Sequence, residues 1–450
     1  MIYKAFKQNA LNFPNQEIAV ENEKFTFKEL LDRVESKKIN FKPFTHIGVF
    51  LENSIEFIES LLIASKYNLT LIPFASKNIN FDKFDIEYIF DGEFKKYKNY
   101  KPKESGYIIV STSGSTSSPK PIVLTEEIKL KRIEIAKKSF NLSNKDTILV
   151  PTPMHHSLAL RGVLISLVLG AKLVLLKNFK SDKFLNAIEN EKVTFTFVVS
   201  NQLEMIKEKL NNYDISSLNS LVSTSYSLNP NTKKELLKQT NVYECYGTSE
   251  IGCVTLLSPQ DIKSHPSSVG KELDGCEIKI KNSEILVKSP WRFKEYYKMP
   301  ETTKEAFEDE FFKTGDVGEI IDGYLYYKGR KKEIIKSGGI TIYPIDIEKE
   351  LKKVRGVKEI AVIGIEDEYF GEVIVAIIEG NANKEDLIKA SKNLATYQRP
   401  MEYIFDTLPR NEMGKIQKFK LIEKYKNLNL GKKLKGFLWK KFQSLFQLTM

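Results

Sequence analysis

The chain contains 450 residues, 42% of them hydrophobic and 11% aromatic, which is enough for more than one domain with a sizeable core. No stretch approaches the roughly 18 uncharged apolar residues of a membrane-spanning helix, and the N-terminal residues lack the apolar segment of a signal peptide, which predicts a cytoplasmic protein. Three cysteines without Cys-x-x-Cys spacing argue against a disulfide scaffold or a zinc site, and a net charge of +11 without an organised basic stripe favours small anionic ligands over nucleic acid.

Residues 1–100 mix short helical and strand patterns. Thr26, followed three residues later by Glu29, has the spacing of a capping box and predicts a helix that starts there. The apolar run 47–51 predicts a buried strand, and the periodicity of 55–65 predicts an amphipathic helix.

A run of hydroxyl and glycine residues at 111–120 lies between two apolar segments, which predicts a loop between two strands. Such a loop presents backbone N–H groups and hydroxyls to an anion, and its lysine adds a positive charge, so we expect it to bind a polyphosphate. The loop is not a Walker A motif, because a proline stands on either side of the lysine. A flexible serine-rich linker is the alternative. The candidate binding residues are Ser113, Gly114, Ser115, Thr116 and Lys120.

Strand and helix patterns alternate from residue 146 to residue 246, which predicts βαβ units and a mostly parallel sheet. Ligands bind beyond the carboxyl ends of the strands in such sheets. The segment Tyr246-Gly-Thr-Ser-Glu250 follows the last of these predicted strands, so it is a candidate for ligand binding. The predicted strands are 147–150, 172–176, 194–199, 220–223 and 242–246.

The remaining chain divides into a β-rich stretch, a charged boundary and a compact α+β pattern. Residues 270–328 are β-rich, with strands predicted at 276–280, 284–288, 319–321 and 324–327, and the run Gly329-Arg-Lys-Lys332 marks the boundary. We therefore predict an α/β protein with a large N-terminal domain (1–328) of mixed and parallel sheets layered with helices plus a β-rich subdomain. A small mobile α+β domain (329–425) and a basic amphipathic tail (426–450) follow. Beyond the boundary, helices are predicted at 345–353 and 384–394 and strands at 359–365, 373–379 and 402–405.

The tail mixes lysines with apolar residues that can share one face of a helix. This pattern predicts peripheral membrane contact through residues 430–450. Docking on the protein itself or on a partner explains the same pattern.

Six motifs in order resemble the adenylate-forming superfamily of acyl-CoA synthetases, luciferases and peptide-synthetase adenylation domains, and are most similar to AMP-forming acyl-CoA synthetases. Besides the loop at 111–120 and the segment 246–250, they include a histidine pair and a Thr-Gly-Asp motif. The others are Gly-Arg followed by Ser-Gly-Gly, and a late lysine motif. These four occupy residues 153–160, 312–316, 329–348 and 408–416.

The resemblance implies that the substrates are ATP, held with Mg²⁺, and a small carboxylic acid. Lys120 and its loop then hold the β- and γ-phosphates, and Glu250 holds Mg²⁺, a cation that prefers carboxylate and phosphate oxygens. Ser249 stands where the family usually has threonine, and its hydroxyl is expected to bind the α-phosphate. Tyr246, with the adjoining Gly247 and Thr248, is expected to lie against the adenine.

The remaining implied roles belong to both predicted domains. Asp316 accepts hydrogen bonds from the ribose hydroxyls, and Arg330 adds a ribose or phosphate contact. His156 shields the acyl-adenylate or gates the carboxylate. Lys415 bridges the substrate carboxylate and the α-phosphate. In the second step, in which a thiol attacks the acyl-adenylate, the resemblance implies that the C-terminal domain rotates about Lys332.

The same resemblance assigns Ser337, Gly338 and Gly339 to the passage of a pantetheine arm, since glycines allow close approach to the backbone. An ordinary β-turn is the alternative there.

Taken singly, each of these residues also has a structural explanation. A lysine is usually a solvated surface group, Asp316 after a glycine is often a turn residue, Tyr246 fits a strand core, and Glu250 fits a cap. A lone buried histidine such as His156 is most often structural.

Together the motifs predict an AMP-forming acid–thiol ligase that activates a carboxylic acid and transfers the acyl group to CoA. A carrier-protein phosphopantetheine acting in trans is the alternative acceptor. A non-catalytic nucleotide-binding or membrane-associated scaffold is the alternative of another class. Intact Glu250, Asp316 and Lys415 argue against the scaffold.

Overall fold

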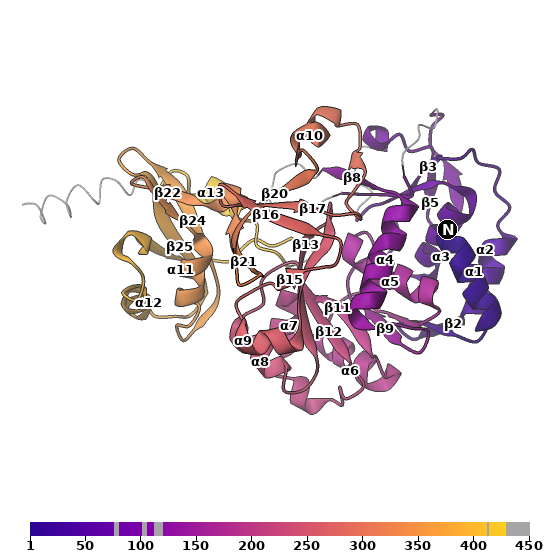
Figure 1. Ribbon diagram of the computed structural model, residues 1–450, viewed down its shortest axis with the longest axis horizontal. Helices are drawn as coiled ribbons and strands as arrows, with labels where there is room; N and C mark the ends of the chain where they lie inside the picture. Colours follow the sequence, from indigo (N-terminus) through magenta and orange to yellow (C-terminus); the bar gives the residue numbers. More distant parts are fainter. Residues whose placement is uncertain (76–80, 101–105, 112–119, 412–413, 429–450) are drawn as a thin grey trace, which may run out of the picture.

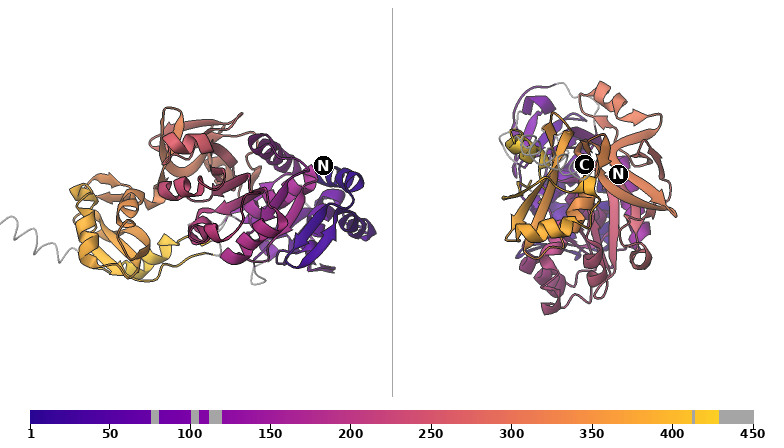
Figure 2. Two further views of the ribbon diagram at one scale, coloured as in Figure 1. Left: turned by 90° about the horizontal axis from the view of Figure 1, so that it is seen from below. Right: turned by 90° about the vertical axis from the view of Figure 1, so that its left-hand side faces the viewer.

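The computed structural model describes residues 1–75, 81–100, 106–111, 120–411 and 414–428. Within these ranges, a large N-terminal part contains three β-sheets and a smaller domain with its own sheet follows it (Figure 1). The smaller domain lies at the end of the molecule opposite to the N-terminal helices (Figure 2). This α/β architecture confirms the predicted fold class. No described helix is long and apolar enough to cross a bilayer.

The largest sheet has nine strands in the order β15-β14-β13-β12-β11-β9-β10-β1-β2. The six neighbouring strands β1, β10, β9, β11, β12 and β13 run parallel to one another. Antiparallel strands complete both edges of the sheet. The parallel strands are apolar and buried along nearly their whole length, as expected where helices cover both faces. The strands are β1 (Glu17–Val20), β2 (Glu23–Thr26), β9 (Thr147–Val150), β10 (Lys172–Leu175), β11 (Phe195–Val199), β12 (Ser220–Thr224), β13 (Val242–Thr248), β14 (Gly252–Leu257) and β15 (Lys271–Glu272).

A second sheet has seven strands in the order β18-β8-β7-β4-β3-β5-β6. β7 and β8 are the two predicted strands on either side of the hydroxyl-rich loop, and they pair in antiparallel orientation. Positions 112–119 of that loop, which include Ser113, Gly114, Ser115 and Thr116, lie outside the described residues. The strands are β3 (His46–Val49), β4 (Thr70–Pro73), β5 (Tyr88–Phe90), β6 (Phe94–Lys96), β7 (Ile108–Ser111), β8 (Pro121–Leu124) and β18 (Glu295–Tyr296).

One continuous core joins these two sheets, because it includes apolar side chains from both of them and from helices α1, α3 and α5. Several of the helices start at a side-chain cap. The predicted capping box of α2 is present, with Thr26 accepting from the N–H of Glu29 and Glu29 accepting from the N–H of Thr26. The helices of this part are α1 (Ile2–Asn12), α2 (Phe27–Ser36), α3 (Ile55–Tyr67), α4 (Glu126–Phe140), α5 (Ser157–Leu169), α6 (Ser181–Glu191), α7 (Ser200–Ile206), α8 (Pro230–Leu236), α9 (Pro259–Ser264) and α10 (Pro300–Glu305).

The predicted β-rich stretch forms a five-stranded antiparallel sheet. Its strand β20 is longer than predicted, because it includes the Thr-Gly-Asp motif and pairs with β21 along most of its length. Asp316 is therefore a strand residue opposite Arg330 and does not belong to a simple turn. The strands are β16 (Glu277–Lys281), β17 (Glu284–Lys288), β19 (Phe307–Glu308), β20 (Phe311–Ile321) and β21 (Tyr324–Arg330).

The C-terminal domain follows a short 3-10 helix at Lys331–Glu333 and has the predicted α+β pattern. Separate apolar clusters lie on the two faces of its sheet, so it has a core of its own. The described residues end at 428, and the predicted tail helix therefore lies outside them. The elements are β22 (Ile335–Ser337), β23 (Ile340–Ile342), α11 (Pro344–Leu351), β24 (Val357–Asp367), β25 (Gly371–Gly380), α12 (Lys384–Ser391), β26 (Glu402–Phe405) and α13 (Lys418–Tyr425).

Candidate active site

The segment predicted to bind ligand ends strand β13 and turns into β14. The pairing shifts register between Tyr246 and Gly247. Gly247 approaches the neighbouring strand so closely that a Cβ atom would lie 1.8 Å from the carbonyl oxygen of Gly252. Only glycine fits this position, because any side chain there would push the two strands apart. Residues 249–251 then form the turn between β13, which ends at Thr248, and β14, which begins at Gly252.

Arg132 of α4 holds this turn in place through three carbonyl groups. Its guanidinium donates to the carbonyl oxygens of Ser249 (3.1 Å), Glu250 (2.9 Å) and Trp291 (3.0 Å). The side chain is buried, and burial together with the neighbouring Arg161 lowers the pKa of Arg132 to about 9. Arg132 therefore fixes the backbone on which the side chains of Ser249 and Glu250 are mounted.

The carboxylate of Glu250 and the ammonium of Lys120 are linked by Tyr296 of β18. The Tyr296 hydroxyl donates to Glu250 Oε1 at 3.1 Å, and Lys120 Nζ lies 4.8 Å from the centre of the same ring. Burial and the Glu250 carboxylate raise the pKa of Tyr296, so the phenol keeps its proton for this bond. The structure thus brings the predicted metal ligand and the predicted phosphate-binding lysine onto one aromatic side chain.

Asp316 is the centre of a buried polar group on the β20–β21 ribbon. Its Oδ2 accepts from the Tyr246 hydroxyl at 2.8 Å, and Arg330 Nε lies 3.0 Å from Oδ1. Burial raises the pKa of Asp316, although Arg330 opposes that shift. The Tyr246 ring also approaches Tyr327, with 6.0 Å between ring centres. Three predicted site residues therefore meet in one cluster.

Lys415 comes from the C-terminal domain and lines the same cavity as Arg330. Residues of both domains line that cavity, which lies where they meet. Burial, reinforced by Arg330, lowers the pKa of Lys415. The loop that carries this lysine touches the large domain directly, because Asn201 Nδ2 donates to the carbonyl oxygen of Gly414 at 2.7 Å. The arrangement of the domains therefore places the late lysine in one cavity with Arg330 of the Asp316 cluster.

Several buried polar atoms have no hydrogen-bond partner among the described residues, and two of them belong to candidate site segments. These two are Nε2 of His156, which precedes α5, and Oγ1 of Thr248. Burial and the adjacent His155, 4.2 Å away between ring centres, lower the pKa of His156 to about 3. The imidazole is therefore neutral at physiological pH. Buried polar groups are nearly always paired in native proteins, so such orphans favour a site that a polar ligand completes.

The predicted residues for the second step lie elsewhere in this arrangement. Lys332 is exposed in the short helix between the domains. Ser337, Gly338 and Gly339 form the hairpin turn between β22 and β23, where both glycines have positive φ, and none of them lines the cavity that contains Lys415. The turn alternative and the binding alternative are both compatible with this geometry. The structure thus separates these residues from the Asp316 cluster.

Three residues of the site carry no motif that sequence reasoning could use. Arg132 stands among other charged residues of α4, Asn201 lies at the start of α7, and Tyr296 is one of two adjacent tyrosines. Nothing in the sequence spacing of Tyr296 connects this residue with Glu250. Only the fold places these side chains beside the motif residues.

The donor set fits a nucleoside triphosphate with a divalent cation. Cationic side chains from both domains face one region, Glu250 Oε2 has no hydrogen bond from the described residues, and Asp316 has the acceptor oxygens that a ribose diol requires. No group of three or more potential metal ligands occurs among the described residues, as expected for Mg²⁺, which is bound by one or two carboxylates plus phosphates.

Comparisons with known proteins agree with this fold, which is that of the adenylate-forming enzymes. Residues 78–297 match the family model of the AMP-binding enzymes, and residues 346–415 match that of the AMP-binding enzyme C-terminal domain. The long-chain-fatty-acid–CoA ligase FadD13 of Mycobacterium tuberculosis is 31% identical over 343 residues, which cover 72% of this chain and 68% of that protein. The chain belongs to the AMP-binding enzyme family.

Further relatives include CoA ligases for other acids. The 2-succinylbenzoate–CoA ligase of Oceanobacillus iheyensis is 32% identical over 331 residues, covering 70% of this chain and 69% of the relative. Among solved structures, o-succinylbenzoate CoA synthetase from Bacillus subtilis superimposes with a TM-score of 0.83 at 22% identity, covering 93% of this chain and 97% of the other. ATP-bound MatB from Rhodopseudomonas palustris gives 0.82 at 23% identity, covering 95% and 100%. These two structures support the fold.

Proposed function

We propose that the protein is an AMP-forming acid–thiol ligase that converts a small carboxylic acid to its acyl-CoA. The placement of Lys415 beside Arg330 and Asp316 carries this proposal, because it brings a cation from the mobile domain to the nucleotide-binding residues of the large one. The CoA ligases among the relatives support the same reaction.

In the first step, a carboxylate oxygen of the acid bonds to the α-phosphorus of ATP while the bond from that phosphorus to the bridging oxygen of pyrophosphate breaks. Two anions must approach, so the chain's own cations lower the barrier. Lys415 is placed to neutralise the carboxylate and the α-phosphate, and Lys120 the leaving phosphates. Mg²⁺ held by Glu250 neutralises phosphate charge when it is bound. Asp316 and Tyr246 orient the nucleoside.

In the second step, a thiol sulfur attacks the acyl carbonyl carbon, AMP leaves with the bonding electron pair, and the thiol proton passes to solvent. The turn Ser337-Gly338-Gly339 is distant from the cavity in the present arrangement, so we propose that rotation about Lys332 brings it there. CoA is the proposed acceptor because the relatives are CoA ligases. A carrier-protein phosphopantetheine is the second candidate.

We also propose that the moving unit comprises residues 329–425 and the fixed unit residues 1–328, because the apolar clusters of the C-terminal domain are its own. Residues 430–450 remain a candidate for peripheral membrane contact. Co-sedimentation with anionic vesicles, comparing the full chain with a chain ending at Asn429, tests that contact. Equal, negligible pelleting of both would exclude it.

The function is tested by measuring pyrophosphate release from ATP with a panel of carboxylic acids, with and without CoA. We expect acid-dependent release and, with CoA, a thioester product. Adding a phosphopantetheinylated carrier protein in place of CoA decides between the acceptors. Acid-independent ATP binding with no pyrophosphate release for any acid would instead favour the scaffold alternative.

A further inference from the structure

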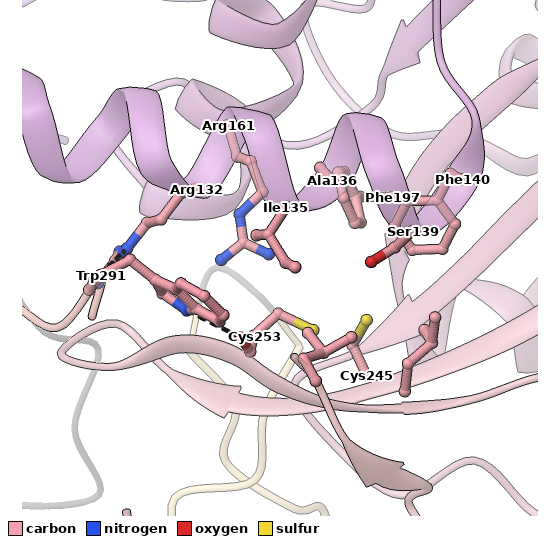
Figure 3. Close-up of a pocket in the computed structure, with 12 residues that line it drawn as sticks. Arg132, Ile135, Ala136, Ser139, Phe140, Arg161, Phe197, Cys245, Cys253 and Trp291 are labelled. Atoms are coloured by element: carbon pink, nitrogen blue, oxygen red, sulfur yellow. Dashed lines mark hydrogen bonds between the residues drawn. The ribbon is translucent and has the colours of Figure 1, made fainter. Parts of the chain in front are cut away.

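A second cavity lies between helices α4 and α5 on one side and strands β11, β13 and β14 on the other (Figure 3). Its lining is largely apolar, with Phe140, Phe197, Cys245 and Cys253 among the residues that face it. Cys245 directly precedes Tyr246 of the candidate active site. Arg132, which holds the carbonyl groups of Ser249 and Glu250, also lines the cavity. The cavity therefore lies beside the turn that carries Glu250, and we consider it for the acyl part of the acid.

Arg161 of α5 projects its guanidinium into this cavity (Figure 3). The guanidinium carbon lies 5.5 Å from the centre of the Phe197 ring. No carboxylate of the described residues lies within ion-pair distance of it, and no acidic residue lines the cavity. Arg161 is partly buried. An arginine in an apolar cavity loses part of its hydration, which a carboxylate ligand would replace.

Two buried basic residues of α4 lie close to Arg161. Lys129 and Arg132 lie one turn apart on α4, and both are almost inaccessible to solvent. Burial, followed by the fields of Arg132 and Arg161, lowers the pKa of Lys129. Arg132 is occupied by three carbonyl groups, whereas Arg161 has no such set of acceptors among the described residues. The region attracts an anion, and Arg161 is the group placed to receive it.

The position of Arg161 along α5 separates it from the reacting centre. α5 begins directly after His156, at the end of the sheet where the candidate active site lies. Arg161 follows five residues later, which corresponds to about 7 Å along the helix axis. The Cα atom of Arg161 thus lies further along α5 than His156, at a separation that leaves room for a second group on the same substrate.

We propose that Arg161 binds a second carboxylate of the substrate, at the end remote from the reacting one, and that the protein activates a short dicarboxylic acid. This inference rests on the proposed ligase function and names its substrate class. A planar guanidinium binds a carboxylate through two parallel hydrogen bonds, so the match is specific. A simple fatty acyl chain would instead leave the charge of Arg161 buried against hydrocarbon.

The test compares dicarboxylic acids with monocarboxylic acids of equal chain length: succinate with butyrate, glutarate with pentanoate, and adipate with hexanoate. Pyrophosphate release is measured for each with the full chain, Mg·ATP and CoA. We expect a kcat/KM for at least one dicarboxylate that is about tenfold or more above its partner, since a site built for a polar group rejects the analogue that lacks it. Ratios at or below one for all pairs would overturn the proposal.

Substitutions then locate the preference. Arg161→Gln is expected to bring the ratio close to one, mainly by raising KM for the dicarboxylate, and Arg161→Lys is expected to retain part of it because the charge remains. Arg355→Gln, on the exposed surface of the C-terminal domain, is the matched control and should leave the ratio unchanged. An equal loss on both members of a pair in Arg161→Gln would contradict the proposal, because it would assign Arg161 to the fold or to the reacting carboxylate.

A binding measurement separates failure of this inference from failure of the proposed function. The preferred dicarboxylate is added without ATP, and the thermal midpoint of wild type is compared with that of Arg161→Gln. A rise in wild type alone, without turnover of any acid, supports the anion site and rejects the ligase. Turnover of monocarboxylates with no dicarboxylate effect supports the ligase and rejects the anion site.

Discussion

Lys415 brings a cation of the C-terminal domain into the cavity that Arg330 also lines. Burial and Arg330 lower its pKa, so a bound phosphate gains strongly from this partly desolvated cation. Asp316 and Glu250 carry negative charge in the same site, and each carboxylate accepts a hydrogen bond from a tyrosine hydroxyl. At this scale, the site consists of charges whose compensation is left for the ligand to complete.

Replacing Lys415 with alanine is expected to slow acyl-adenylate formation by roughly 10²–10³-fold, since one preorganised charge opposite the transition state is lost. Lys420→Ala, an exposed lysine on the following helix, is the matched control and should retain wild-type rates. Pyrophosphate exchange measures the first step, and thioester formation from supplied acyl-adenylate measures the second. Loss of the second step alone would contradict the assigned role.

His156 makes a prediction about acid stability. Its pKa in the folded chain is about 3, below the ordinary value of 6.5, so between these values the unfolded state binds a proton that the folded state does not. Stability is therefore lost as the pH falls below about 6.5. Replacing His156 with Gln removes this term and should reduce the loss between pH 7 and pH 5 by up to about 2 kcal/mol. Urea unfolding at the two pH values measures it, with the partly buried His265→Gln as the control.

Sequence reasoning predicted the motif residues but few of their contacts. Asp316, Tyr246, Arg330 and Lys415 were predicted from local patterns, and the fold places the first three in one cluster and the lysine in the adjoining cavity. The partners Arg132 and Tyr296 were not predicted, because the first lies 118 residues before Glu250 and the second 46 residues after it. No local pattern can encode contacts over such separations.

Helix α4 fixes the β13–β14 turn through the hydrogen bonds that Arg132 donates to its carbonyl groups. Replacing Arg132 with methionine leaves the carbonyls of Ser249, Glu250 and Trp291 without their donor and should cost roughly 2–4 kcal/mol of stability. We also expect a rise in the Mg²⁺ concentration needed for half-maximal rate, because Glu250 loses its fixed backbone. Lys131→Met, an exposed neighbour on the same helix, should change neither quantity.

Helix α13 is held to the C-terminal domain by a buried ion pair. Lys418 Nζ lies 2.7 Å from Glu348 of α11 and 3.5 Å from Glu333 at the start of the domain. Burial alone would lower the pKa of Lys418, but these two carboxylates outweigh it and raise that pKa. The pair therefore connects the last described helix with the segment that leads into the domain.

Breaking this pair by Lys418→Met is expected to cost about 3–5 kcal/mol, because Glu348 stays buried without its cation. The double variant Lys418→Met/Glu348→Gln should cost less than the sum of the single changes, since the stranded charge is gone. Hydrogen exchange of α11 and α13 reports the change locally. Additive effects would mean that the two groups do not interact.

At the scale of elements, periodicity was a reliable guide where burial is regular. The parallel strands and the helices between them follow apolar patterns that the alternation from 146 to 246 predicted. β20 was predicted only over 319–321, whereas it begins at Phe311. The Thr-Gly-Asp motif interrupts the apolar pattern with a glycine of positive φ, so pairing with β21 and β17, and not local propensity, extends this strand.

The whole molecule places the two domains in one definite arrangement through the contact between Asn201 and Gly414. A Cβ atom on Gly414 would lie 3.9 Å from Asn201 Cβ, within the range that a disulfide bridges. In the variant Asn201→Cys/Gly414→Cys, oxidation should lock this arrangement. We expect pyrophosphate release to persist while thioester formation stops, because the domain can no longer rotate.

The reduced form of the same variant is the control, since it carries the same side chains and the strain of a positive φ of 73° at position 414. Reductant should restore thioester formation. The single-cysteine variants should not respond to oxidation. Unchanged thioester formation in the oxidised form would show that the second step needs no change of domain orientation.

Arg330 ends β21 and stands two residues before Lys332, while its guanidinium neutralises Asp316 across the ribbon. A ribose that hydrogen-bonds Asp316 competes with Arg330 for the same oxygens. The orientation of the C-terminal domain and the occupancy of the proposed nucleotide site are then thermodynamically coupled, and the coupling is reciprocal. If ribose binding favours the release of Arg330 by a given free energy, the reoriented C-terminal domain favours ribose binding by the same free energy.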